Sequence, residues 1–269
     1  MQQASVPNPL DSMLERIDAC MHTQPEEALR LCDKVFEQAR SLKQPVAYVT
    51  AAERYGRLMD HLGRGSEARN VLFAAQQVAQ SALLFSNEAK LLEEIARSYY
   101  TAGQYRLAIQ YWARCVEVSD QAGRDARTWI LAKVGLSQVY FGLGDFKSGL
   151  ELLREAESRL HEVDDPHLDA KIKINLGVDL TEAGQPKEAY AAFLQARDLC
   201  ARHEFFDYSA ESNFRLGQLA LLDGALDAAM SYFETSLVDA RRVNYRWCEA
   251  HVLAAQSEIL ARKNNHAQA

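Results

Sequence analysis

The sequence predicts an all-α protein, built as a solenoid of stacked antiparallel helix pairs. Its 269 residues include only 6 prolines and 13 glycines, and the residues that favour helix are abundant. No Asn-Gly or Asp-Gly dipeptide stands between alternating strands as a hairpin signal. Most importantly, one pattern of small and large apolar residues recurs about every 40 residues, which is typical of a repeat array.

A small residue five positions after a turn residue defines the repeat. The six pairs are Thr23/Ala28, Gly63/Ala68, Gly103/Ala108, Gly144/Gly149, Gly184/Ala189 and Gly224/Ala229. Their second members are 40, 40, 41, 40 and 40 residues apart. Glycine at the turn supplies the left-handed backbone that ends the first helix of a pair, helix A, and Pro186 is suited to begin a second helix, helix B.

Each unit also pairs a small residue in helix A with a large apolar residue in helix B. The small residues are Gly56, Ala96, Ser137, Gly177 and Gly217, and the large ones are Leu72, Trp112, Leu153, Phe193 and Phe233. Because residues i and i+4 share a helix face, this register predicts close contact between the two helices of a pair. Trp129 and Trp247 fall outside the register, and the sequence leaves open whether they are buried.

The pattern of Leu-Gly, a turn Gly, then Ala, Phe and Ala resembles the tetratricopeptide repeat, and residues 176–196 carry it best. The resemblance covers roughly residues 10–262 and implies a right-handed superhelical solenoid whose A helices line the concave surface. The units are longer than the usual 34 residues. In this they resemble repeats of bacterial signalling proteins, namely Rap-type regulators and the regions that precede diguanylate cyclase domains. The segment that looks most like the latter is LDSMLERIDACMHTQPEEALRLCDKVFEQAR, but the chain has no Gly-Gly-Asp-Glu-Phe motif.

We expect one domain over residues 1–269, with six helix pairs in residues 10–243 and a closing helix over 244–262. An unpaired, more polar helix covers the last apolar face of a solenoid. The residues after 262 are expected to fray.

Charge and composition restrict the classes of partner. The formal net charge is −7 and no run of Lys or Arg exceeds two residues, so we expect no nucleic-acid partner. No apolar run approaches the length of a membrane span, and the first nine residues do not read as a signal peptide. We therefore predict a cytoplasmic protein without membrane contact, and five reduced cysteines in half-buried core positions.

The sequence carries no motif of a known catalytic site, so we predict that the chain is not an enzyme and binds no cofactor. His-Glu-x-x-His, Gly-x-Ser-x-Gly and the phosphate-binding Gly-x-x-x-x-Gly-Lys are all missing from it. His161, Asp164, Asp165 and His167 are chemically able to hold a metal. They stand around Pro166 where polar turn residues are expected, so we predict a linker and no metal site.

The non-packing face of helix A is expected to form the binding groove, at about −6, −3, +1 and +4 from the small residue. We predict partner contacts at eleven positions: Glu53, Arg57, Glu93, Arg97, Tyr100, Gln138, Phe141, Lys171, Asn175, Phe214 and Gln218. This face is charged in the N-terminal units and apolar from unit four onward. Two alternatives stay open. The apolar positions from unit four onward could belong to the core and not to the groove, and Arg57 and Arg97 could pair with Glu53 and Glu93 and not with a partner. Acidic residues at 53 and 93 depart from the Lys and Asn pattern of tetratricopeptide carboxylate clamps.

The leading hypothesis from the sequence is therefore a non-catalytic scaffold or regulatory sensor module that binds a peptide or protein segment in its concave groove. A first alternative is a structural adaptor that forms a homodimer through its terminal helices. A second is the regulatory region of a cyclic-di-GMP signalling protein that lacks its catalytic domain.

Overall fold

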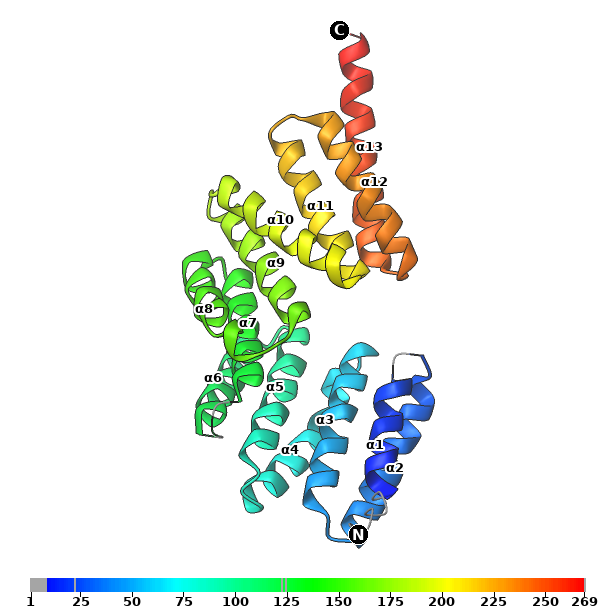
Figure 1. The fold of residues 1–269 in the computed structure, drawn as a ribbon, viewed down its shortest axis with the longest axis vertical. Helices are drawn as coiled ribbons and strands as arrows, with labels where there is room; N and C mark the ends of the chain where they lie inside the picture. Colours follow the sequence, from blue (N-terminus) through cyan, green and yellow to red (C-terminus); the bar gives the residue numbers. More distant parts are fainter. Residues whose placement is uncertain (1–8, 22, 122, 124, 269) are drawn as a thin grey trace, which may run out of the picture. The chain divides into compact units, whose positions relative to one another are not determined.

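The computed structural model describes residues 9–21, 23–121, 123 and 125–268, the last five of these as backbone only. Within these residues the chain forms helices and no strand (Figure 1). In order, they are α1 Pro9–Cys20, α2 Pro25–Ser41, α3 Pro45–His61, α4 Gly65–Ser81, α5 Phe85–Thr101, α6 Tyr105–Gln121, α7 Ala126–Gly142, α8 Phe146–Ser158, a 3₁₀ turn η1 Leu160–Glu162, α9 Pro166–Glu182, α10 Pro186–His203, α11 Phe206–Leu222, α12 Leu226–Arg242 and α13 Arg246–Gln268.

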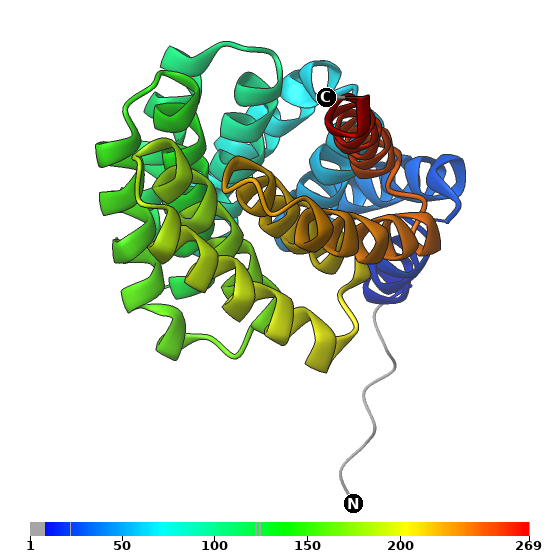
Figure 2. The same ribbon diagram turned by 90° about the horizontal axis from the view of Figure 1, so that it is seen from above.

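The order of helices confirms the predicted all-α repeat. Successive helices are joined by short turns, and each odd-numbered helix up to α11 is the A helix of a pair (Figures 1 and 2). The chain divides into two compact units, Met1–Val139 and Tyr140–Ala269, with the boundary inside α7. We describe each unit by itself; a single continuous domain over 1–269 stays a prediction.

The turns explain where the helices stop. The predicted turn glycines at 63, 103, 144, 184 and 224 all have positive φ, between 70° and 78°. Four of the turns that follow B helices use the same left-handed conformation at a residue other than glycine, namely Lys43, Leu83, Glu204 and Asn244, whereas Gly123 adopts it after α6. A residue with a Cβ is strained in this conformation. Because none of the four is glycine, these turns could not be recognised from the positions of glycines in the sequence.

The predicted small-to-large contacts form the core of both units. A Cβ built on Gly177 would lie 2.4 Å from Cε1 of Phe193, and one on Gly217 would lie 2.5 Å from Cε1 of Phe233. Both rings are at most 1% exposed. The absent side chain of each glycine is therefore the space that the ring fills, and the two helices approach closely because of it.

Trp112 shows a contact that the register did not predict. Its indole lies against Gly135 of α7, where an added Cβ would lie 2.3 Å from Cε2. From the sequence, Ser137 was predicted as the small residue of this helix A, the first helix of the fourth repeat. Ser137 is buried and its hydroxyl donates to the Val134 carbonyl at 2.7 Å. Trp129 is also buried, at 8% exposed, whereas Trp247 is 43% exposed.

We predict that Gly177→Ala lowers the free energy of unfolding by about 1–3 kcal/mol, because the methyl group overlaps the Phe193 ring. Helix propensity alone gives the opposite sign, a gain of about 1 kcal/mol. Urea denaturation decides between them. The double variant Gly177→Ala/Phe193→Leu should cost less than the sum of its two single variants. A Gly177→Ala chain more stable than the wild type contradicts the packing.

The last helix, α13, runs six residues beyond the expected end at 262. Residues 261–268 contain neither Gly nor Pro, so no local signal ends the helix earlier. In the part of the chain that is described, no helix combines the length and the apolar character that crossing a bilayer requires.

Candidate functional site

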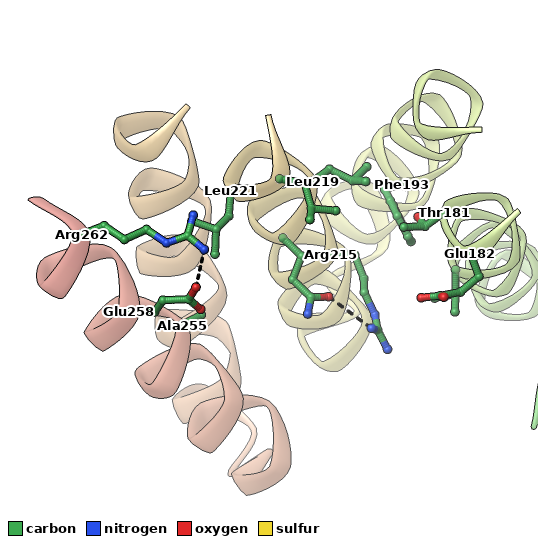
Figure 3. Close-up of a pocket in the computed structure, with 12 residues that line it drawn as sticks. Thr181, Glu182, Phe193, Arg215, Leu219, Leu221, Ala255, Glu258 and Arg262 are labelled. Atoms are coloured by element: carbon green, nitrogen blue, oxygen red, sulfur yellow. Dashed lines mark hydrogen bonds and ion pairs between the residues drawn. The ribbon is translucent and has the colours of Figure 1, made fainter. Parts of the chain in front are cut away.

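A cleft of about 470 Å³ lies on unit 2, between the A-type helices α9, α11 and α13 (Figure 3). Half of its lining residues are apolar and half are polar or charged. They are Val178, Thr181, Glu182, Phe193, Arg215, Gln218, Leu219, Leu221, Leu222, Ala255, Glu258 and Arg262. Ligand sites usually combine apolar surface with polar groups that fix the orientation of the ligand, and this cleft offers both.

Arg215 is the polar centre of this cleft. Its guanidinium donates to Gln218 Oε1 at 3.2 Å and to Glu211 Oε1 at 3.4 Å, while its Nε is buried without a hydrogen-bond partner. The same guanidinium lies 5.6 Å from the ring centre of Phe214 and 6.0 Å from that of Trp247. Both rings are within the range of cation–π contact, and the Arg215 guanidinium gives the cleft a positive charge.

The other charges of the cleft stand on its two outer helices. Glu258 and Arg262 of α13 form an ion pair one helical turn apart. From α9, Glu182 extends toward Arg215 (Figure 3). Thr181 lies beside it and turns its hydroxyl back to the Gly177 carbonyl at 2.7 Å. The cleft therefore offers both signs of charge around an apolar floor.

A second cleft, of about 460 Å³, lies on unit 1 and is mostly charged. Its lining comes from the end of α1 and from α3 and α5: Asp18, Met21, Thr50, Glu53, Arg54, Arg57, Asn87 and Lys90. Arg54 is held by both oxygens of Asp18, at 2.7 and 2.6 Å. Its single apolar residue leaves little surface on which an apolar side chain can be buried.

Next to that cleft, two arginines share a buried carboxylate. Arg57 pairs with Glu53 and Arg97 pairs with Glu93, and both also approach Glu94 Oε1, at 3.7 and 3.6 Å. Glu94 is 4% exposed and its Oε2 has no hydrogen-bond partner. Burial raises the pKa of Glu94 to about 8, although the two cations act against it. This geometry supports the pairing alternative for the arginines, which are already engaged by this chain's own glutamates.

The structure corrects the expected position of the groove in α5, α7, α9 and α11. The residue three places before the small one was expected at the surface, but Glu93, Val134, Ile174 and Phe214 are all at most 6% exposed. Phe214 is 5.9 Å from Phe233 and 5.9 Å from Trp247, between ring centres. It thus takes the core alternative and offers no groove surface.

The remaining predicted residues are half-buried and lie in both units. Tyr100 packs on Trp112 with ring centres 5.8 Å apart, and Phe141 packs on Phe146 at 5.5 Å. Asn175 donates to the Lys171 carbonyl at 2.8 Å, within α9. Gln138 lies in unit 1. Of the eleven predicted residues, Gln218 lines the cleft of unit 2, and Glu53 and Arg57 line that of unit 1.

Sequence reasoning missed Arg215, Glu258 and Arg262. Arg215 stands two places before Gly217, next to the −3 position that proved to be interior. Glu258 and Arg262 lie on α13, which was expected only to close the solenoid. An i,i+4 pair of opposite charge on that helix was the available signal.

The sequence's other chemical candidates have structural roles. Asp165 caps α9 by accepting from the Leu168 backbone N–H at 3.0 Å, and His167 stacks on Tyr208 at 4.4 Å between ring centres. All five cysteines are free, and all except Cys20 are buried. Burial raises the pKa of Cys32 and of Cys200 to about 12, so both thiols are protonated at neutral pH.

No protein-family model and no curated protein sequence matches this chain. Solved structures do resemble it. BtubC from P. vanneervenii is 16% identical, with a TM-score of 0.68 over 88% of this chain and 93% of that one. Aspartyl phosphate phosphatase F from Bacillus subtilis is 14% identical, with a TM-score of 0.70 over 96% and 68%.

Two further similar structures are described as complexes with peptides. NprR with its cognate peptide NprX is 14% identical, with a TM-score of 0.64 over 96% of this chain and 73% of that one. The Rap conjugation gene regulator of plasmid pLS20 with the Phr* peptide is 14% identical, with a TM-score of 0.66 over 94% and 74%. Kinesin light chain repeats, described as tetratricopeptide-like, also match. Together with the 40-residue helix pairs, these likenesses establish that the chain has the tetratricopeptide-repeat fold.

Proposed function

We propose that this chain is a non-catalytic, cytoplasmic scaffold or regulatory sensor that binds a peptide or protein segment. The cleft of unit 2 is the proposed site, and the observation that carries the proposal is its lining. Six apolar residues surround Arg215, whose buried Nε has no partner. The complexes of NprR and the Rap regulator with peptides support the same class of ligand.

The lining also indicates what kind of peptide fits. Apolar side chains of the peptide would lie against Leu219, Leu221 and Val178. A backbone carbonyl or a carboxylate would accept from the accessible part of the Arg215 guanidinium, whose side chain is 26% exposed. The charged cleft of unit 1 is a poorer candidate because its arginines are already paired and it has one apolar residue.

The proposal predicts that filling the cleft blocks binding. A random peptide library displayed on phage is selected against the wild-type chain, and the enriched peptides are measured by fluorescence anisotropy. Thr181→Trp should weaken them at least about tenfold, because the indole occupies the space between α9 and α11. Thr235→Trp is the matched control. Thr235 is exposed on α12, outside the cleft, and like Thr181 it donates to a carbonyl four residues back.

Two results would contradict the proposal. One is that no peptide is enriched over an unrelated helical protein. The other is that the enriched peptides bind the wild type and the folded Thr181→Trp chain equally well.

A further inference from the structure

One face of α13 is apolar, exposed and equivalent by repeat to a face that α12 covers on α11. The exposed face runs along Ala250, Leu253, Ser257 and Leu260, on the i, i+3, i+7, i+10 spacing of one helix side. Leu253 is 44% exposed and Leu260 is 54% exposed. The opposite side of the helix is buried through Cys248, Val252 and Ile259. Two apolar faces on one helix indicate two packing surfaces, of which unit 2 covers one.

The repeat shows what covers the equivalent face elsewhere. Forty residues earlier, Ala210 and Gly217 occupy the positions of Ala250 and Ser257. There the Phe233 ring of α12 fills the space over Gly217. Three residues after that ring, the Ser236 hydroxyl donates to the Ala210 carbonyl at 2.7 Å.

The same contacts recur in other helix pairs. Phe193 of α10 fills the space over Gly177 of α9. In unit 1, Cys115 donates to the Ala89 carbonyl at 3.1 Å, and it stands three residues after Trp112. The B helices α10 and α12 therefore each bring an aromatic residue to the small residue of their helix A, and α4 brings Leu72 to Gly56 in the same way. A residue with a small polar side chain follows three places later in two of the pairs.

We propose that α13 docks one amphipathic helix from a partner protein, which takes the place of a B helix. The partner helix carries an aromatic residue opposite Ser257 and a small residue three places after it, and it buries Leu253 and Leu260. This surface lies on the side of α13 away from Ala255, Glu258 and Arg262, which face the cleft of unit 2. The inference is thus independent of the proposed peptide site.

The test uses the protein's own B helix as the probe. A fluorescein-labelled peptide of residues 225–243, which spans α12, is titrated with the full chain and followed by anisotropy. We expect a Kd of about 10–100 µM, as befits a single helix on a small interface. The same peptide with Phe233→Ala should bind at least about tenfold more weakly, because the ring is its main anchor.

Variants of the chain locate the binding surface. Leu253→Glu and Leu260→Glu should each weaken binding about tenfold or more, while Val238→Glu should not, although Val238 of α12 is 67% exposed. Ser257→Phe should also block binding by filling the space for the ring. Thr181→Trp, which lies in the cleft, should leave the affinity for the labelled peptide unchanged. Circular dichroism checks that each variant is folded.

Three outcomes overturn the inference. The first is no change in anisotropy up to about 1 mM chain. The second is binding that Leu253→Glu, Leu260→Glu and Ser257→Phe all leave unchanged. The third is a homodimer in sedimentation that the same α13 substitutions dissociate, because the face is then taken by a second copy of this chain.

Discussion

Replacing Phe233 by alanine is expected to lower the free energy of unfolding of unit 2 by about 3–5 kcal/mol. The ring is fully buried between Gly217 of α11 and Phe214, whose ring centre is 5.9 Å away. Gly217 has no side chain that can move into the space, so the cavity persists. The same deletion removes the contact that holds α12 on α11, so the loss falls on the whole C-terminal part of the unit.

Urea denaturation measures this loss, and hydrogen exchange should show it as faster exchange in α11, α12 and α13. Tyr190→Ala is the control, because it deletes an aromatic ring from B helix α10 that is 40% exposed. The Tyr190 hydroxyl shares a hydrogen bond with that of Tyr232 at 3.1 Å, so the variant should cost about 1 kcal/mol, well below the loss at Phe233. If the two variants lose similar stability, the ring of Phe233 is not the element that joins the helix pair.

The pH dependence of stability is expected to change when Asp179 is replaced by asparagine. Asp179 is 3% exposed, its Oδ2 has no hydrogen-bond partner, and burial raises its pKa from 3.8 to about 7. In the unfolded chain the carboxylate ionises near pH 4, while in the folded chain it keeps its proton until about pH 7. Between these values the folded state binds more protons, so stability falls as the pH rises, and it levels off above pH 7.

Asp179→Asn cannot titrate, so its stability relative to the wild type should rise across this window. The full difference is up to about 4 kcal/mol. Urea midpoints at several values between pH 4.5 and 8.5 measure it. Asp145→Asn is the control, since Asp145 caps α8 and its hydrogen bonds from Ser148 lower its pKa. That contribution is lost only as the pH falls toward 4, so in this window the control should run parallel to the wild type. A parallel profile for Asp179→Asn would show that the carboxyl is ionised in the folded chain.

The contact between the small residue of helix A and the large residue of helix B could be predicted from the sequence, because it depends on side-chain size at a fixed spacing. Gly177 with Phe193 and Gly217 with Phe233 stand out as small and large residues 16 apart, and the structure places each pair in contact. The residues of the candidate site were harder to predict from the sequence. Position −3 holds Glu93 in one unit and Phe214 in another, and sequence alone could not show that both are interior. Phe214 is covered by Trp247, which lies 33 residues further along the chain.

The sequence by itself predicted the all-α repeat, the succession of helix pairs, and the small and large residues that meet in the pairs α9–α10 and α11–α12. These follow from local periodicity, from turn glycines and from contacts between neighbouring helices. Tertiary structure alone decided that Arg57 and Arg97 are engaged by this chain's own glutamates, that Arg215 and Arg262 line one cleft, and that α13 has a second apolar face in the open. Those outcomes depend on how far each helix is rotated about its axis. Packing of the whole unit fixes that rotation, and no stretch of sequence does.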